Sequence, residues 1–207
     1  MVVIGITGSI GMGKTAAAAA LRRLRIPVFE ADREVHRLLH AKRGEIGKAF
    51  PEATKGGAID RARMAEIVFH DAAARSRLER ILHPHVRAAE LKFLKAQRMR
   101  GARMAALDIP LLFETGADRL CDAAIAVTAP HFLQRARVLA RPGMTEARFK
   151  AILDAQMPDA EKRRRADFVL PTGLGQRFAL NGLRRIVRFV RRKRRARDCP
   201  RYRNHRT

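Results

Sequence analysis

The 207-residue sequence has no tryptophan, one tyrosine and only 5% aromatic residues. No apolar run approaches the ~20 residues that a membrane-spanning helix needs. Two cysteines, Cys121 and Cys199, are too few for a disulfide framework and lack the spacing of metal ligands, so we expect both to be reduced. Zinc-finger and aromatic RNA-binding motifs are also missing, which argues against a dedicated nucleic-acid-binding module. The start has no basic segment before its short apolar run, so a signal peptide is not indicated and we expect a cytoplasmic protein without a membrane partner.

Acidic residues are scarce as well, with 20 Asp and Glu against 44 Lys and Arg, which gives a formal net charge of +24. Between residues 184 and 206, twelve Lys and Arg accompany one acid, a local charge of +11. A basic surface suits polyanionic ligands such as nucleotides, and the tail could contact nucleic acid nonspecifically or anionic lipid. A general arginine bias explains the tail equally well. Nothing in the sequence indicates an oligomeric state.

Short apolar runs alternate with helical stretches along most of the chain. Strands are predicted at residues 2–6, 27–29, 104–107, 123–127 and 168–170. Helices are predicted at residues 16–24, 33–39, 130–140, 145–157 and 174–195, and within a long stretch from 60 to 100. Pro84 should break or kink that stretch, so we expect at least two helices in it. This alternation predicts an α/β protein with a parallel five-stranded sheet covered by helices on both faces.

Residues 8–15 fit the phosphate-loop pattern G-x-x-x-x-G-K-[ST] at every fixed position. Glycines let successive backbone N–H groups turn toward phosphate oxygens, and the helix that opens at Lys14 adds its N-terminal partial positive charge. Lys14 is predicted to reach the β- and γ-phosphates of ATP, and the Thr15 hydroxyl to ligate Mg²⁺. The predicted ATP-binding residues are Gly8, Ser9, Gly11, Met12, Gly13, Lys14, Thr15 and Ala16.

Two acids follow predicted strands, at the edge of a parallel sheet where ligands bind. Asp108 suits the metal shell, directly or through water, and Asp32 is then available as the base that accepts the proton of the attacking hydroxyl. A purely structural role is open for each: Asp32 as the N-cap of the following helix, and Asp108 as a turn residue before Pro110.

Gln134, Arg137 and Arg141 share one face of a predicted helix, and Gly143 follows as a possible hinge. Arginines on a mobile lid can neutralise the charge on a transferring phosphoryl group, but a solvated basic face fits the same spacing. His83 lies between helical segments and fits a substrate contact or a helix cap equally well.

Several motifs together resemble the dephospho-CoA kinase family. The selective ones are Asp-Ile-Pro-Leu-Leu-Phe-Glu at residues 108–114 and Leu-Glu-Arg-Ile-Leu-His-Pro at residues 78–84. Further similar segments are the phosphate loop and residues 30–32, 69–71, 155–158 and 166–169. The resemblance runs in order from about residue 2 to residue 183. It departs from the family at residues 170–173, where Leu-Pro-Thr-Gly replaces a more usual Asn or Asp before glycine.

The resemblance implies transfer of the ATP γ-phosphoryl group to the ribose 3′-hydroxyl of dephospho-CoA, the last step of CoA synthesis. It implies a kinase domain over residues 1–183, with an inserted helical lobe at about 60–100 and a lid at about 130–157, followed by an Arg-rich helix and tail at 184–207. By the same resemblance, Asp32 is the catalytic base and Arg137 and Arg141 are lid residues. The acceptor side is implied for Asp32, His83, Arg87, Leu111, Phe113 and Glu114.

Two alternatives remain open from the sequence. One is another small-molecule kinase with a phosphate loop, acting on a nucleoside monophosphate or on shikimate. The other is a nucleic-acid-binding protein that retains a phosphate loop, which the basic tail would favour.

Overall fold

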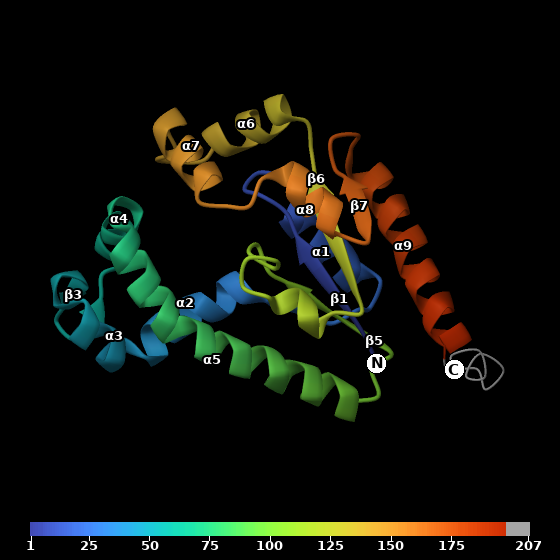
Figure 1. Cartoon of the computed structure of the whole chain (residues 1–207), viewed down its shortest axis with the longest axis horizontal. Helices are drawn as coiled ribbons and strands as arrows, with labels where there is room; N and C mark the ends of the chain where they lie inside the picture. The colour runs from blue at the N-terminus through green and yellow to red at the C-terminus, as the bar shows by residue number, and fades with distance from the viewer. Residues whose placement is uncertain (198–207) are drawn as a thin grey trace. The chain divides into compact units, whose positions relative to one another are not determined.

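A computed structural model describes residues 1–197, with side chains up to Arg192. The chain divides into two compact units (Figure 1). The first unit combines Met1–Phe29 with the chain from Gln97 onward, and the second is Glu30–Ala96. The predicted boundaries of the lobe and the lid stay predictions.

The first unit contains a five-stranded sheet in the order β2-β5-β1-β6-β7, with β1 at its centre (Figure 1). Its strands are β1 (Val2–Thr7), β2 (Val28–Glu30), β5 (Met104–Asp108), β6 (Ala123–Thr128) and β7 (Phe168–Pro171). β1 pairs in parallel with β5 and β6, and β6 pairs in parallel with β7. All residues of β1 and β5 are buried, as expected of short apolar strands in the middle of a parallel sheet. The predicted strands and parallel α/β class are confirmed.

One face of the sheet packs against helices α1 (Lys14–Arg23) and α9 (Gln176–Arg197). α9 runs alongside β7 in Figure 1. The shared core draws apolar side chains from both helices and from alternate strand positions, including Ile4, Ile125, Leu21, Leu183 and Val187. Burying such side chains is the main favourable contribution to folding, so α9 is part of the core although it lies near the end of the chain.

On the opposite face of the sheet, the loop after β5 packs against β1. A Cβ on Gly5 would lie 2.8 Å from atoms of both Leu112 and Cys121, so glycine lets the loop after β5 approach the strand closely. Cys121 Sγ donates to the carbonyl of Ala117, and Cys199 lies outside the described residues. The remaining elements of this unit are the 3-10 helix η2 (Ala117–Leu120) and helices α6 (His131–Leu139), α7 (Glu146–Asp154) and α8 (Asp159–Arg165).

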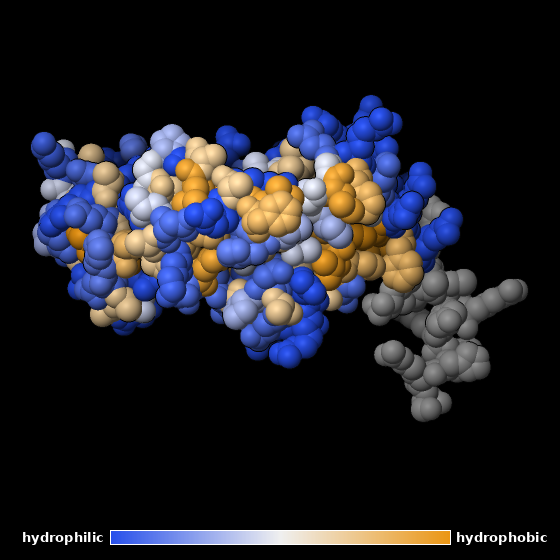
Figure 2. All heavy atoms as spheres, turned by 90° about the horizontal axis from the view of Figure 1, so that it is seen from above, coloured by the Kyte–Doolittle hydropathy of each residue, from blue (hydrophilic) through white to orange (hydrophobic). Residues whose placement is uncertain are grey.

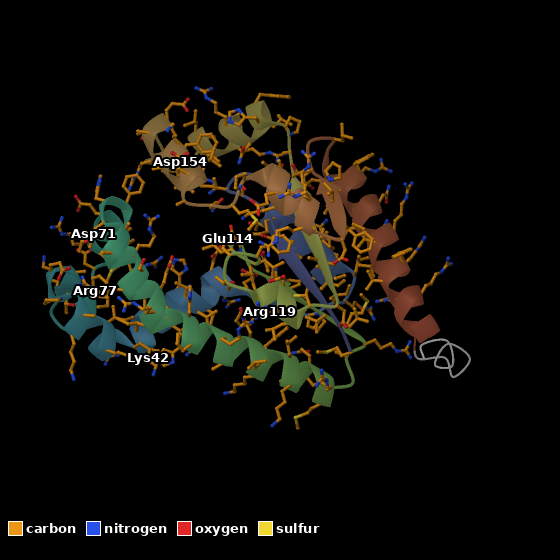
Figure 3. The ribbon with its side chains drawn as sticks, viewed as in Figure 1. Lys42, Asp71, Arg77, Glu114, Arg119 and Asp154 are labelled. Carbon is orange, nitrogen blue, oxygen red and sulfur yellow. The ribbon has the colours of Figure 1, made fainter. Side chains whose placement is uncertain are left out.

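The second unit is mainly helical. It contains α2 (Ala31–Ala41), α3 (Arg43–Ala49), the 3-10 helix η1 (Pro51–Ala53), the short strands β3 (Thr54–Lys55) and β4 (Ala58–Ile59), α4 (Arg61–His70) and most of α5 (Ala72–Met99). Phe50 is fully buried, and the guanidinium of Arg77, labelled in Figure 3, lies 4.4 Å from its ring centroid. Ile46 on α3 and Met64 on α4 add further buried apolar side chains.

The stretch from residue 60 to residue 100 contains two helices, as predicted, but Pro84 does not divide them. α5 is continuous through Pro84, and the division into two helices falls at Asp71, between α4 and α5. The Asp71 carboxylate accepts hydrogen bonds from the backbone N–H groups of Ala73 and Ala74, which caps the start of α5. A proline removes one hydrogen bond of the helix, and a helix of 28 residues keeps the others.

The face seen in Figure 2 mixes hydrophilic areas with several areas of hydrophobic side chains. The large apolar side chains that stay exposed in the first unit are Met99, Phe132, Val169, Leu174, Phe178 and Phe189. Within residues 1–197, no helix combines the length and the apolar character needed to cross a membrane. The last ten residues of the predicted basic tail lie outside the described part of the chain.

Candidate active site

The phosphate loop joins the end of β1 at Thr7 to the start of α1 at Lys14. Gly13 is the N-cap of α1 and has a φ of 91°, in the left-handed region that residues with a Cβ rarely adopt. A Cβ at this position would also lie 2.8 Å from Thr172 Oγ1. The pattern therefore requires glycine here for two reasons, the backbone conformation and the close approach of Thr172.

Side chains from outside the motif hold the loop in shape. The carbonyl of Met12 accepts a hydrogen bond from Thr172 Oγ1 at 2.6 Å, and its buried Sδ lies 3.1 Å from the Ala129 amide. At the tip of the loop, the Ile10 amide donates to Gln156 Oε1 at 3.2 Å. The Ile10 carbonyl accepts from Gln134 Nε2 at 2.8 Å. These contacts tie the loop to α6 and to residues 129, 156 and 172.

Lys14 and Asp108 meet at the carboxyl edge of the sheet. Lys14 Nζ lies 2.7 Å from Asp108 Oδ1, and the two side chains are 15% and 6% exposed. β1 and β5 are neighbours in the sheet, with Ile6 opposite Asp108, so the sheet register brings the two motifs together. Because both side chains are largely excluded from water, the electrostatic attraction between them is stronger than in an exposed ion pair. The structure therefore joins two of the residues predicted to handle phosphate and metal.

The two predicted lid arginines differ in their contacts. Arg137 on α6 donates to the Gly11 carbonyl at 3.3 Å and to the carbonyl of Thr172 at 3.0 Å. It also donates to Thr172 Oγ1 at 3.2 Å. Arg141 lies just beyond α6 and is exposed. Arg137 therefore lies directly against the phosphate loop, and Arg141 follows one turn later along the chain.

The loop after β5 places its predicted acceptor residues in contrasting environments. Phe113 is 6% exposed, and the guanidinium of Arg165 lies 4.8 Å from its ring centroid. Leu111 is half-buried. Glu114, labelled in Figure 3, forms an ion pair with Lys162 of α8. The acceptor role of these three residues stays a prediction.

The other predicted site residues belong to the second unit. Asp32 lies in the first turn of α2 and is exposed. His83 and Arg87 lie one turn apart on α5, so they share a face of that helix. Arg87 Nη1 donates to Glu90 Oε2 at 3.1 Å, and Glu90 is 3% exposed. Burial raises the pKa of Glu90, and Arg87 beside it acts in the opposite direction.

Four residues that organise the first unit's site are not predicted as such from the sequence: Gln134 as a loop contact, Gln156, Lys162 and Thr172. Gln134 was grouped with Arg137 by helical spacing, which is a usable signal because both contact the phosphate loop. Thr172 and Gln156 act over sequence separations of 160 and 146 residues. No local pattern reports contacts at such distances.

Comparison with known proteins gives consistent matches. A family model described as dephospho-CoA kinase matches residues 2–174. A dephospho-CoA kinase of Paramagnetospirillum magneticum is 53% identical over 79% of this chain and 78% of its own length. One from Rhodopseudomonas palustris is 47% identical over 84% of this chain and 88% of its own length.

Solved structures give the same picture. A crystal structure of a Thermus thermophilus protein is similar with a TM-score of 0.81 and 38% identity, covering 90% of this chain and 95% of that one. The dephospho-CoA kinase of Campylobacter jejuni has a TM-score of 0.69 and 26% identity, covering 93% of this chain and 98% of its own.

Proposed function

This chain belongs to the dephospho-CoA kinase family, whose members use ATP in the final step of CoA biosynthesis, and on that premise we propose how its residues perform the reaction. The γ-phosphoryl group of ATP passes to the ribose 3′-hydroxyl of dephospho-CoA, in the cytoplasm. The observation that most supports this is the contact between Lys14 of the phosphate loop and Asp108 of the Asp-Ile-Pro-Leu-Leu-Phe-Glu segment, at 2.7 Å. It joins the general nucleotide motif to the segment most selective for the family.

The phosphate loop binds the nucleotide. Backbone N–H groups of the phosphate loop and of the start of α1 bind the phosphate oxygens, except those of Ile10, Met12 and Ala16, which donate within the protein. Lys14 leaves Asp108 and binds the β- and γ-phosphates. Arg137, already bonded to the Gly11 carbonyl, adds positive charge beside the loop. Arg141 reaches the transferring group when the helices of the lid close.

Oxygen donors suited to Mg²⁺ lie next to the loop. Thr15 is exposed in the first turn of α1, and the Asp108 carboxylate lies at the end of β5. Mg²⁺ prefers hydroxyl, carboxylate and phosphate oxygens, so these two residues fit the ion together with the nucleotide. Bound Mg²⁺ would neutralise charge on the phosphoryl oxygens.

Asp32 accepts the proton of the attacking 3′-hydroxyl, and the acceptor is bound through His83, Arg87, Leu111 and Phe113, with Glu114 contributing indirectly. His83 and Arg87 share a face of α5, as two groups that bind one ligand should. Binding energy from the distant pantetheine arm positions the hydroxyl, so truncated acceptors should lose kcat as well as affinity.

An acceptor panel tests the assignment. ADP release is measured with dephospho-CoA, adenosine, AMP and shikimate at the same ATP concentration, and the product is weighed by mass spectrometry. We expect one added phosphate on dephospho-CoA and poor or no turnover of the other acceptors. Conversion of AMP to ADP with equal efficiency would identify a nucleotide kinase instead.

The variant Asp32→Asn tests the base, because it preserves shape and removes the proton acceptor. We expect kcat to fall by roughly 10²–10⁴-fold with little change in the KM for ATP. Asp60→Asn is a matched control, since Asp60 caps α4 in the same unit. A normal kcat with a raised KM for ATP would place Asp32 on the nucleotide.

A further inference from the structure

A fully buried lysine, Lys162, binds the loop after β5 at two points. Lys162 lies on α8, and its side chain is 0% exposed. Its Nζ donates to the carbonyl of Pro110 at 2.9 Å and lies 2.9 Å from Glu114 Oε1. A buried ammonium group is strongly disfavoured unless its charge and its hydrogen bonds are compensated. Both ends of the segment from Pro110 to Glu114 provide that compensation.

The Glu114 carboxylate has its own donors within the protein. Oε1 accepts from the Met157 amide at 3.0 Å as well as from Lys162. The side chain is only 21% exposed, although Glu114 itself comes from the surface loop labelled in Figure 3. Because Oε1 already accepts from an ammonium group and a backbone amide, only Oε2 remains for a further donor.

The segment from Gln156 to Lys162 contacts both loops of the site. Gln156 holds the tip of the phosphate loop through the Ile10 amide, while Met157 and Lys162 hold the loop after β5. This segment begins two residues after the end of α7, the second helix of the predicted lid. Pro110, one of the groups held, is two residues from Asp108 and also accepts from Thr7 Oγ1 at 2.8 Å.

We propose that Lys162 and Glu114 are positioning residues, which hold the loop after β5 in register with the phosphate loop and thereby fix Asp108 beside Lys14. Glu114 then acts through Lys162, and its contribution to acceptor binding is indirect. The expected fall in kcat rests on the proposed function. The positioning of the loop after β5 rests only on the contacts described above. Loss of the link misplaces Asp108, which lowers kcat more than it raises the KM of either substrate.

Three full-length variants and a control test this. Lys162→Met keeps the volume of a long side chain and removes the charge, and we expect kcat to fall by roughly 10–100-fold, with both KM values within about threefold of wild type. Glu114→Gln should show a smaller fall in the same direction. The double variant should fall no further than Lys162→Met, because both changes act on one contact. Arg164→Met removes a charge from the exposed part of the same helix and should behave as wild type.

Hydrogen exchange provides a readout that needs no reaction. Backbone amides of the loop, such as those of Thr115 and Ala117, donate to Leu111 and Leu112 carbonyls and should exchange slowly in the wild type. Lys162→Met and Glu114→Gln should speed exchange over residues 109–117, and Arg164→Met should not. If Lys162→Met does not fold, Glu114→Gln is judged by the same kinetic and exchange measurements.

Two results would overturn the inference. One is a raised acceptor KM in Glu114→Gln with kcat and exchange unchanged, which would indicate direct contact with the acceptor. The other is a double variant whose effects are the product of the single ones, which would indicate independent roles. Should the wild type fail to phosphorylate dephospho-CoA while the exchange results hold, the proposed function fails and the positioning role stands.

Discussion

Replacing Gly13 with alanine tests how the phosphate loop is held. Gly13 has a φ of 91°, and a Cβ there would lie 2.8 Å from Thr172 Oγ1. The left-handed conformation costs a residue with a Cβ roughly 1–2 kcal/mol. Displacing Thr172 also weakens its 2.6 Å hydrogen bond to the Met12 carbonyl, a contribution of about 1 kcal/mol. The free energy of unfolding should therefore fall by about 2–3 kcal/mol.

Gly175→Ala is a closely matched control. Gly175 precedes α9 as Gly13 precedes α1, has a φ of 94°, and a Cβ there would meet nothing within 4 Å. This variant bears the conformational cost without the collision. For a chain of this size 1 kcal/mol corresponds to about 2–4 °C in Tm, so Gly13→Ala should melt lower than Gly175→Ala by about that amount.

Thermal unfolding with and without a nonhydrolysable ATP analogue completes the experiment. A ligand that binds only the folded state raises Tm, so the shift reports nucleotide affinity. We expect Gly175→Ala to keep the wild-type shift and Gly13→Ala to lose most of it. Equal Tm values and equal shifts for the two variants would refute the argument that the Thr172 contact shapes the loop.

Three further predictions concern single contacts. Lys14→Ala should retain the wild-type circular dichroism spectrum and lose turnover by at least about 10²-fold, because the transferring phosphoryl group loses a fixed positive charge; turnover near the wild-type rate would contradict the loop assignment. Burial raises the pKa of Glu90 above its ordinary value, so the folded state loses stability as the pH rises from the ordinary glutamate pKa through the raised one, and the gain in Tm of Glu90→Gln over wild type should grow with pH from about 4 to neutral. A gain that shrinks over this range would show that the ion pair with Arg87 dominates. Truncation after Arg192 removes seven Lys and Arg and should spare activity while weakening retention on heparin, since the core side chains of α9 among the described residues, up to Val190, are all kept; lost activity would contradict this.

The local features of the fold could be predicted because they depend on neighbouring residues. The strands of the sheet follow from short β-branched and apolar runs, and the phosphate loop from its fixed glycines and Lys14. A helix was predicted from residue 145, and the Thr145 side chain accepts from the Arg148 amide at the start of α7. The β3–β4 hairpin was missed although its signal was present. Gly56 and Gly57 both have positive φ, as a two-residue hairpin turn requires.

Other features, such as α8 and the order of the strands, depend on long-range contacts that no local sequence pattern predicts. α8 was not predicted because its residues, Asp-Ala-Glu-Lys-Arg-Arg-Arg, have no apolar face. In such a run Lys162 resembles its solvated neighbours, yet it is the residue that is buried, because Glu114 and Pro110 lie opposite it. The order of the strands, and with it the meeting of Lys14 and Asp108, also depends on long-range pairing.

The way Ile10 is held affects where substitutions can be tolerated. Ile10 occupies a variable position of the phosphate-loop pattern, and its main chain is held by amides of Gln134 and Gln156, which lie 124 and 146 residues further along the chain. Since the interaction uses only backbone atoms of Ile10, many side chains are compatible with that position. The two glutamines are constrained instead, because each needs a side chain of this length that ends in an amide group to reach the backbone of Ile10. In related chains, the positions of Gln134 and Gln156 should therefore vary less than that of Ile10, although neither glutamine lies within the motif.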